Sequence, residues 1–415
     1  MNLKRSFVLF VSLLFLNLLS AEGKILAIED AVRLAKENNI SVKKAENTLD
    51  NLELLNKYSW NSVSPTVTLS GNISDDIEND SSSFSFSGSV KLNLKTNLYS
   101  EIKGAKLNYE KGLLTYNEAV RKIERSVRKN FYNLIYQKEN LVLQKRSLET
   151  SKTQYLNNQE KFQNGKISEL DAFTSRVNYE SKKPVVESAE INFQNDLASF
   201  KQLLGIPQET EIALDGSLDD FLNLKEISFG LLPKVDEPAP DVKSAEYDVE
   251  IAKNSLLNLR FSAYAPVITG SYSYGKSKNQ LSVEVSVPLD GILPWSSRAV
   301  DIKKQKNALD TAEKVLEDAK TTVAVQTESY IRKINQAVKQ LDSLKSTEKL
   351  AEQTYKMTLA AYNYGKTDFL SLQNANDSVL SAGVNLKSQA YTLISAILDL
   401  ESVLGLEFGT LETKK

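Results

Sequence analysis

Residues 162–171 read FQNGKISELD, and residues 362–371 read YNYGKTDFLS. In both segments an aromatic residue precedes a Gly-Lys pair by three positions, and each segment lies between two long polar stretches with helical character. A glycine just past a helix end supplies the left-handed conformation that terminates the helix. We therefore predict one helical hairpin that turns near residue 165 and a second that turns near residue 365.

The similarity extends along the whole length of both hairpins. Tyr155 corresponds to Tyr355, and the helix stop Leu204–Gly205 corresponds to Leu404–Gly405. Several matches at one fixed spacing indicate an internal duplication rather than chance similarity between two helix ends. The predicted divisions are a first structural repeat over residues 22–205, a linker or equatorial segment over 206–241, a second repeat over 242–405 and a C-terminal tail over 406–415.

Each half also contains two segments with the alternation that is typical of a β-strand. In residues 83–95, Phe, Val, Leu and Gly alternate with Ser, Lys and Asn, so one face is apolar and the other polar. The acidic segment 75–81 that precedes this run is expected to be a loop in water. The four predicted strands are residues 66–74, 83–95, 267–274 and 281–289.

Each pair of strands leads into a stretch without Gly or Pro, over residues 113–164 in the first half and 295–364 in the second. At 1.5 Å per residue these stretches would form helices of about 78 and about 105 Å. Such helices project beyond a compact domain and must pack their apolar seams on neighbouring helices as coiled coils. The fold class is therefore mainly α with a small β part, in a two-fold repeat of strand, strand, long helix, turn and helix.

One basic cluster lies inside the first long helix. Its members are Arg121, Lys122, Arg125, Arg128 and Lys129. Basic residues on a long polar helix are most simply assigned to its solvated face, and we predict that location for all five.

The composition excludes several classes of function. The 415 residues contain no Cys and no His, and the net charge is −2. Zinc sites built from Cys or His, histidine general bases and thiol nucleophiles are therefore impossible. The charge gives no electrostatic basis for binding nucleic acid. We expect no catalytic residue, no metal site and no cofactor.

The first residues have the pattern of an export signal. Lys4 and Arg5 precede the apolar run 7–19, and Leu19-Ser20-Ala21 forms a plausible cleavage site. The run is shorter than the roughly 20 residues that span a bilayer as a helix. We predict a signal peptide over residues 1–21. Because no Cys follows the run, we expect no cysteine-linked lipid anchor.

The strands raise a problem of closure. Amphipathic runs of about 9–11 residues have the length and the alternation of membrane-spanning strands. The edge of a sheet cannot face lipid, and the smallest closed membrane barrels have about eight strands. Four strands in one chain would therefore require several chains for one barrel. A four-stranded sheet packed on helices in water is the alternative that the strands alone leave open.

The order of these elements resembles the TolC-like outer-membrane efflux protein family over essentially the whole mature length. The resemblance rests on the duplicated element order, on the two Gly-Lys turn segments and on the first helical segment, residues 28–39, which read IEDAVRLAKENN. It implies a homotrimer in which twelve strands form one β-barrel in outer-membrane lipid, continued by an α-helical coiled-coil barrel across the periplasm. It also implies two partners, a periplasmic adaptor protein and an inner-membrane pump or ABC transporter.

The resemblance also indicates which residues lie at the periplasmic tip. The turns at Gly165, Lys166, Gly365 and Lys366 are the predicted docking site for the adaptor. Family members hold the tip closed with a Tyr, an Asp and an Arg. Tyr362 and Asp171 match the first two.

The rest of the family's gate pattern is absent. Thr367 occupies the position of the Arg, and Ser371 and Asn374 occupy positions where some members have acidic rings. Asp368 is the candidate substitute, so the predicted tip gate consists of Asp171, Tyr362 and Asp368. A gate with fewer ionic contacts should depend on packing and neutral hydrogen bonds.

The resemblance implies an exit duct for small molecules or proteins in a tripartite efflux or type I secretion system. Drug efflux, metal efflux and protein secretion all remain open, because substrate choice usually belongs to the pump and the adaptor. The alternative from another class is a secreted coiled-coil structural or adhesive protein without a pore. Such a protein would extract into buffer, whereas a membrane barrel would require detergent.

Overall fold

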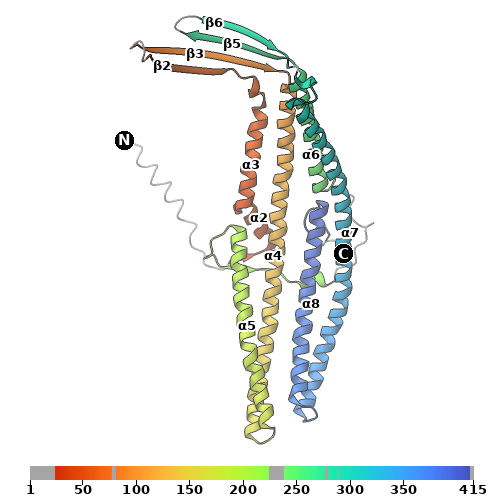
Figure 1. The fold of residues 1–415 in the computed structure, drawn as a ribbon. Helices are drawn as coiled ribbons and strands as arrows, with labels where there is room; N and C mark the ends of the chain where they lie inside the picture. Colours follow the sequence, from red (N-terminus) through yellow and green to blue (C-terminus); the bar gives the residue numbers. More distant parts are fainter. Residues whose placement is uncertain (1–23, 77–80, 224–237, 276–278, 289, 412–415) are drawn as a thin grey trace, which may run out of the picture.

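A computed structural model describes residues 24–76, 81–223, 238–275, 279–288 and 290–411. Long helices run side by side along the molecule, and a curved sheet extends from one end of them (Figure 1). The two helical turns lie together at the opposite end (Figure 1). The predicted fold class, mainly α with a small β part and a two-fold repeat, is confirmed. The predicted signal peptide lies outside the described residues.

The two halves contain corresponding elements in the same order. The first half contains β1 (Lys24–Leu26), α2 (Ile28–Asn38), α3 (Ile40–Lys57), η1 (Ser59–Val63), β2 (Thr66–Asp76), β3 (Ser81–Lys95), α4 (Leu98–Gln163) and α5 (Glu169–Leu204). Then follow β4 (Ile212–Leu214), η2 (Asp219–Asn223), α6 (Pro240–Tyr264), β5 (Val267–Gly275), β6 (Asn279–Ser286), η4 (Asp290–Ile292), α7 (Ser297–Asn363) and α8 (Phe369–Leu404). Helices α4 and α7 have 66 and 67 residues, which corresponds to about 100 Å each.

The sheet and the two levels of helices that follow it along the molecule place elements of the two halves in a matching lateral order. The sheet has the order β2-β3-β5-β6. Beside the sheet the helices pack in the order α3-α4-α6-α7, and toward the turns in the order α5-α4-α8-α7. Each layer therefore begins with an element of the first half and ends with one of the second. Within the described ranges, no helix is both apolar enough and long enough to cross a membrane.

The sheet is antiparallel, and its register separates apolar from polar side chains. Val67 lies opposite Val90, Val90 opposite Tyr272, and Tyr272 opposite Leu281. Residues directly opposite each other in an antiparallel pair share one face. One row of apolar side chains therefore crosses all four strands. The neighbouring row, Thr66, Lys91, Ser271 and Ser282, is polar and lies on the other face.

The strand ends differ from the prediction. Asp75, Asp76 and Ser81 belong to the first hairpin rather than to a loop, because Asp75 pairs with Ser82 and Asp76 pairs with Ser81. The rest of the predicted loop lies outside the described residues. The last strand begins at Asn279 and ends at Ser286, short of the predicted residue 289. Pro288 lacks the N–H that a ladder requires, which accounts for the earlier end.

The widest hydrophobic core lies at the waist, halfway along the helices. Strands β1 and β4 pair in parallel there, and their Leu26 and Leu214 belong to one buried cluster with side chains of α2, α4 and α8. Phe131 of α4 and Phe200 of α5 are among its largest fully buried side chains. The sequence did not predict β1 and β4, because three residues are too few to show a period. The predicted linker contains β4 and the 3-10 helix η2, and its residues 224–237 lie outside the described part.

The helical pattern of the sequence continues from Ile28 to about Trp60, but the structure divides this stretch into α2 and α3 at Asn39. Asn39 has an extended backbone, and its side-chain oxygen accepts a hydrogen bond of 2.8 Å from the Ser41 N–H. Its side-chain nitrogen donates at 2.8 Å to the Leu203 carbonyl at the end of α5. Asn39 therefore caps α3 and also holds the first helices against the end of the hairpin.

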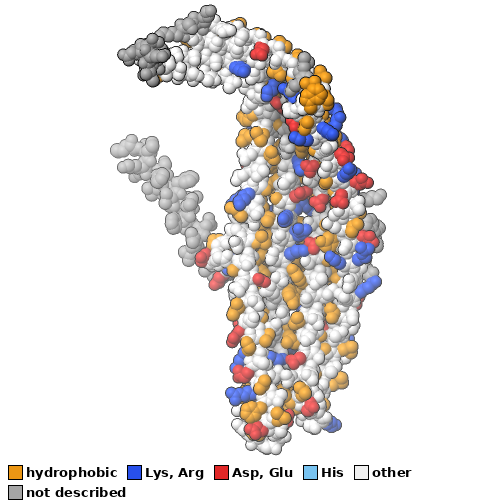
Figure 2. Space-filling model, in the orientation of Figure 1, with side chains coloured by type: hydrophobic (Ala, Val, Ile, Leu, Met, Phe, Trp, Pro, Cys, Tyr) orange, Lys and Arg blue, Asp and Glu red, His pale blue; other side chains and the backbone are white. Residues whose placement is uncertain are grey.

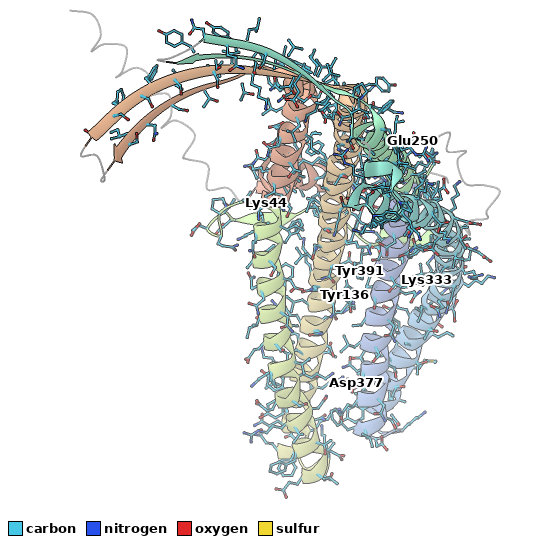
Figure 3. The ribbon with its side chains drawn as sticks, turned by 45° about the horizontal axis from the view of Figure 1, so that its top comes forward. Lys44, Tyr136, Glu250, Lys333, Asp377 and Tyr391 are labelled. Carbon is cyan, nitrogen blue, oxygen red and sulfur yellow. The ribbon has the colours of Figure 1, made fainter. Side chains whose placement is uncertain are left out.

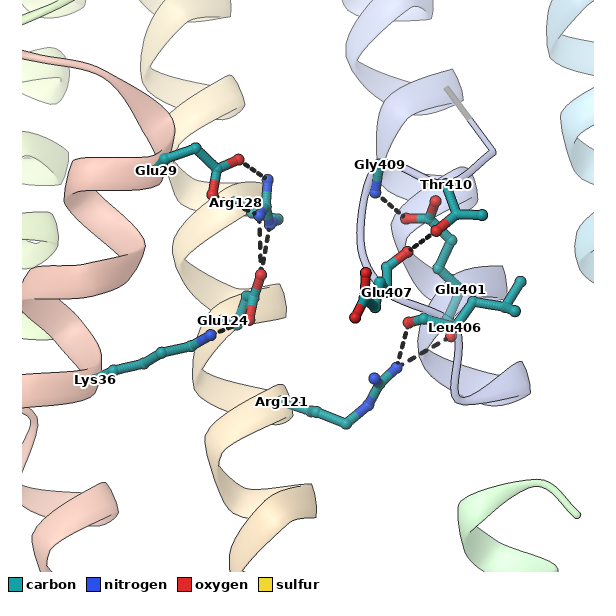
Figure 4. Close-up of polar contacts among 10 residues, drawn as sticks. All are labelled: Glu29, Lys36, Arg121, Glu124, Arg128, Glu401, Leu406, Glu407, Gly409 and Thr410. Carbon is teal, nitrogen blue, oxygen red and sulfur yellow. Dashed lines mark hydrogen bonds and ion pairs between the residues drawn. The ribbon is translucent and has the colours of Figure 1, made fainter. Parts of the chain in front are cut away.

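The prediction that the basic cluster on α4 faces solvent holds for Lys122, which is exposed, and was wrong for the other four residues. Arg128 is buried and contacts Glu124 and Glu29 (Figure 4). Lys129 forms an ion pair of 2.7 Å with Asp399 of α8. Arg121 donates to the main-chain oxygens of Glu401 and Leu406 (Figure 4). Arg121, Arg128 and Lys129 therefore hold α4 to α2 and α8 at the waist. Their acidic and carbonyl partners on α2 and α8 are distant in the sequence.

The segment after α8 folds back over the end of that helix. The fully buried carboxylate of Glu401 accepts hydrogen bonds from the N–H groups of Gly409, at 3.1 Å, and Leu411, at 2.8 Å. The guanidinium groups of Arg121 and Arg128 lie over the Phe408 ring. Burial raises the pKa of Glu401, while the two N–H donors and both arginines act in the opposite direction. One carboxylate thus fixes the described part of the predicted tail.

We expect Glu401→Ala to destabilise the waist. It would leave the buried Leu411 N–H without the carboxylate that accepts its hydrogen bond, at a cost of about 1–3 kcal/mol. Thermal unfolding followed by circular dichroism would measure the loss. Glu407→Ala, which removes an exposed carboxylate from the same segment, is the matched control and should change the unfolding temperature little. Equal effects of the two variants would contradict this role for Glu401.

Candidate functional site

One candidate surface is the apolar face of the four-stranded sheet. Its large hydrophobic side chains are exposed, including Ile73, Leu281 and Val283, which is 70% exposed. The face of the sheet that is visible in Figure 2 carries few hydrophobic side chains, as expected for the polar side. On that polar side Ser74 and Ser83 lie 2.8 Å apart through their hydroxyl oxygens, and Ser271 and Ser282 lie 2.7 Å apart. The apolar face thus has no partner among the described residues.

Aromatic residues gather where the sheet meets the helices. The chain has two tryptophans, and both lie at this junction, Trp60 in η1 and Trp295 just before α7. They are 52% and 77% exposed. Tyr264, at the end of α6, donates to the Gly291 carbonyl and keeps half of its surface exposed. Amphipathic rings in such a position are typical of the boundary between a bilayer and water.

The second candidate surface is the pair of turns at the far end of the helices. Gly165 and Gly365 have φ angles of 69° and 68°. In each turn the following lysine donates its N–H to a carbonyl five residues earlier, Lys166 to Lys161 and Lys366 to Ala361. This bond and the positive φ define a Schellman motif. The two predicted docking turns therefore share one conformation, and both lysines are exposed.

The two predicted gate aspartates both take part in the N-terminal caps of helices. Ser168 is the N-cap of α5, and its hydroxyl accepts from the Asp171 N–H and donates to the Asp171 carboxylate at 2.8 Å. At the start of α8 the residue types are exchanged, and Asp368 accepts from the Ser371 N–H at 2.7 Å. Hydrogen bonds from Ser371 lower the pKa of Asp368. Both carboxylates therefore have a local structural task.

At the tip of one chain, Tyr362 contacts residues of both α4 and α8. Its hydroxyl donates to the side-chain oxygen of Asn158 at 2.7 Å, its ring packs edge-on against Phe369, and the Lys161 ammonium lies 4.6 Å from the ring centre. Burial raises the pKa of Tyr362, the hydrogen bond with Asn158 lowers it, and the negative charge of Asp171 raises it further. Asp171 is thus near Tyr362, but its recorded side-chain bond is to Ser168. Sequence reasoning missed Asn158.

Asn158 belongs to a polar seam on α4. Ser147, Ser151, Gln154 and Asn158 are all buried, and their spacing is that of the core positions in a coiled coil. Gln154 donates to the Tyr355 hydroxyl, at 3.4 Å. Among the described residues, the Gln154 side-chain oxygen and the Asn158 side-chain nitrogen have no hydrogen-bond partner. The half of α4 near the tip therefore packs with polar residues where the waist uses Phe and Leu.

The tip has no acidic cluster that could bind a metal ion, since no group of three or more carboxylates that could hold one occurs among the described residues. Thr367, Ser371 and Asn374 are neutral. The turn and its neighbourhood therefore offer hydrogen bonds and packing, with Asp171 and Asp368 as nearby carboxylates.

Comparisons with known proteins agree with this geometry. The model of the family described as outer membrane efflux protein matches residues 31–206 and 231–406, one match in each half. The Campylobacter jejuni CmeC outer membrane channel superposes with a TM-score of 0.77 and 18% sequence identity over 91% of this chain and 85% of that chain. The open state of the Neisseria gonorrhoeae MtrE outer membrane channel gives 0.75 and 18% over 91% and 89%.

The Vibrio cholerae outer membrane protein VceC gives a TM-score of 0.74 and 14% identity over 92% of this chain and 96% of that chain. No curated protein sequence matches the chain. At 14% to 18% sequence identity, the similarity to these solved structures shows the fold alone.

We expect Tyr362→Phe to loosen the tip. The change removes the one recorded hydrogen bond of the buried Asn158 side chain, at a cost of about 1–3 kcal/mol. Faster exchange of amide hydrogens in residues 155–163, measured by mass spectrometry, would report this loosening. Tyr364→Phe is the matched control, because Tyr364 is two residues away and 80% exposed. Unchanged exchange in the Tyr362 variant would show that the bond does not hold the tip.

Proposed function

This chain belongs to the outer membrane efflux protein family, and we propose that three copies of it form an exit duct through the outer membrane and the periplasm. The observation that carries the proposal is the sheet, which has one continuous exposed apolar face and two open edges. We propose that lipid covers this face and that neighbouring copies pair with the edges. The helices then continue the duct as a tunnel on the periplasmic side.

The number of strands supports several copies. In the described part of the chain, β2 and β6 each pair on one side only. Unpaired N–H and C=O groups in lipid cost several kcal/mol each, so a membrane sheet must close on itself. Closed membrane barrels begin at about eight strands, and four strands per chain fall below that limit. Three chains supply twelve. A secreted coiled-coil protein without a pore would leave the apolar face in water, which makes that alternative the weaker one.

The aromatic residues at the junction of the sheet and the helices support this orientation of the chain in the membrane. Trp60, Trp295 and Tyr264 lie between the apolar sheet and the polar helices. With the sheet in the bilayer, these rings fall at the headgroup level on the periplasmic side, where such rings are enriched. Residues 1–21 would direct the export that this location requires.

The two turns support a docking role. In a ring of three chains, the turns at Gly165-Lys166 and Gly365-Lys366 would present six copies of one backbone motif at the end farthest from the sheet (Figure 1). We propose that a periplasmic adaptor binds them and that an inner-membrane pump or ABC transporter supplies the substrate. We propose that the hydrogen bond between Tyr362 and Asn158 holds the tip closed, together with Asp171 and Asp368 at the starts of α5 and α8.

The barrel is tested by a charge on its outer face. Val283→Arg should reduce the heat-modifiable oligomer that detergent extracts from membranes, because an arginine near the bilayer midplane costs about 2–4 kcal/mol. Glu284→Arg places the same side chain at the adjacent position on the polar face and should leave the yield unchanged. Equal yields for both variants, or extraction of the wild type into plain buffer, would contradict the membrane barrel.

Docking is tested by charge reversal at the tips. Replacing Lys166 and Lys366 by Glu together should weaken binding of the adaptor, measured by co-purification from membranes, because both side chains are exposed on the turns. The oligomer yield should not change, since the turns are far from the sheet. Lys122→Glu with Lys303→Glu gives the same charge change away from the tip and serves as the control. Normal adaptor recovery with the tip variant would exclude the lysines from the docking surface.

A further inference from the structure

Helices α8 and α6 meet end to end in the middle of the chain. In Figure 1, α6 lies above the end of α8 and beside the long helix α4. Gly405 ends α8 in the left-handed conformation, with a φ angle of 74°. A Cβ added to Gly405 would lie 3.0 Å from Pro240 at the start of α6. The two helix ends therefore touch, and the polar groups beside this joint depend on neighbouring helices for partners.

The first half contains an equivalent joint, between α5 and α3. The two family matches, residues 31–206 and 231–406, are offset by 200 residues, so Asn39 corresponds to Ala239 and Leu203 to Val403. Asn39 closes the first joint, because its side chain donates to the Leu203 carbonyl at 2.8 Å. Ala239 precedes α6 and makes no side-chain cap. The second joint therefore lacks the group that closes the first.

A cavity of about 320 Å³ lies at this second joint, between α4, α6, α7 and α8. Val403, the equivalent of the residue that Asn39 covers in the first half, lines it. Lys122, Asp241 and Gln326 also line it and are exposed, so they mark its mouth. The volume is at the lower end of the range for small-molecule sites, which is about 300–1,000 Å³.

The cavity has a simple structural cause. Toward the tip, α4 and α8 are in direct contact, where Tyr136 and Tyr391 stack with ring centres 6.1 Å apart (Figure 3). In the other direction α8 ends at Leu404, whereas α4 continues without a break toward the sheet. A space therefore opens beside α4 at the point where one helix of the layer stops and the next begins.

Opposite charges lie at the two ends of the cavity wall that α4 provides. Glu118, Arg121, Lys122 and Arg125 all line the cavity, and their spacing of three, four and seven residues places them on one face of the helix. Glu118 lies nearer the sheet, beside Asp241 of α6. Burial raises the pKa of Glu118, and the charge of Asp241 raises it further, although neighbouring cations act in the opposite direction. Arg125 lies nearer the tip.

The groups at both ends lack close partners inside the chain. One carboxylate oxygen of Glu118 is buried and has no hydrogen-bond partner among the described residues. The Arg125 guanidinium lies 3.7 Å from the Asp399 carboxylate, whereas Lys129 pairs with that carboxylate at 2.7 Å. Arg121 differs, because main-chain oxygens already accept from it (Figure 4). Since buried polar groups in native proteins are generally hydrogen-bonded, Glu118 and Arg125 indicate a missing ligand.

We propose that this cavity is a binding site for a small zwitterion of about the size of a dipeptide. The ammonium group of the ligand lies between Glu118 and Asp241, and its carboxylate contacts Arg125 and Lys122. One chain carries the whole site, so this inference does not depend on the ring of copies proposed above.

The positions of the charges favour a zwitterion over a simple ion. Phosphate would leave the buried Glu118 oxygen unpaired beside Asp241, and a simple cation would leave Arg125 without a close acceptor. Glu118 and Arg125 are separated by two turns, about 10 Å along the axis of α4. An extended dipeptide spans about 7 Å, which leaves room for a charge-assisted hydrogen bond at each end.

The ligand would do at the second joint what Asn39 does at the first. By contacting Asp241 of α6 and Arg125 of α4, it would tie the start of α6 to the long helix. A ligand that binds only the folded chain stabilises it. Occupancy should therefore raise the unfolding temperature as well as produce heat of binding.

Isothermal titration of the purified full chain in detergent tests the site, with the dipeptide alanylalanine as the probe. N-acetylated alanylalanine lacks the ammonium group, and alanylalanine amide lacks the carboxylate. We expect each blocked form to bind at least about tenfold more weakly, because each loses one charge-assisted contact. Equal binding of the N-acetylated form or of inorganic phosphate would overturn the zwitterion, and a lack of binding by alanylalanine would overturn the site.

Variants assign the two ends of the ligand. Glu118→Gln should weaken binding of alanylalanine at least about tenfold and leave the N-acetylated form unchanged, because that form has no ammonium group to lose. Arg125→Gln should weaken both of these ligands and spare the amide. Glu313→Gln and Lys303→Gln, at exposed positions of α7 nearer the sheet, are the matched controls and should change nothing. Equal losses for all three ligands in either cavity variant would contradict the assigned orientation.

Circular dichroism separates loss of the site from loss of the fold. Without ligand, Glu118→Gln should keep the helical content of the wild type. At a concentration that saturates the wild type, alanylalanine should raise the unfolding temperature of the wild type more than that of Glu118→Gln. An equal rise in the two proteins would place the dipeptide elsewhere and overturn the assignment to this cavity.

Discussion

The need to satisfy the backbone hydrogen bonds of β2 and β6 is the constraint on which the rest of the molecule depends. A sheet with an apolar outer face requires lipid, and lipid leaves no water to bond an open edge. The chain cannot close four strands into a barrel. It therefore relies on copies of itself, and every layer below the sheet repeats the same order so that the helices close in step with the strands. The long helices, their coiled-coil packing and the turns at the tip all continue that ring away from the membrane.

Packing changes in character along the helices. At the waist, Phe131, Phe200 and Leu393 are fully buried, and ion pairs around Arg128 and Asp399 hold α4 to its neighbours. Nearer the turns, α4 buries Ser147, Ser151, Gln154 and Asn158 instead. Apolar burial supplies most of the stability of a helix pair, whereas buried polar groups favour one register at the expense of stability. The waist is thus the firm part of the duct, and the tip is the part that can rearrange at lower cost.

Much of this architecture could be predicted from the sequence, for reasons that particular residues make clear. Strands with strict alternation, such as residues 83–95, and the Gly-Lys turns carry strong local signals. The contacts that could not be predicted join residues that are far apart in the sequence. Arg128 was assigned to solvent because its partner Glu29 lies 99 residues away. The bond between Tyr362 and Asn158 spans 204 residues. Local patterns carry no information on such pairs, and β1 and β4 are too short to carry a pattern at all.

The waist core has a consequence for biogenesis. Leu26, near the start of the described chain, and Leu411, near its end, belong to the same hydrophobic cluster. Contacts with so large a sequence separation form late, because the whole intervening chain must be in place first. A chain that is still being delivered from its N-terminus therefore lacks the piece that completes its centre. The hydrophobic cluster at the waist is therefore complete only when Phe408 and Leu411 are in place.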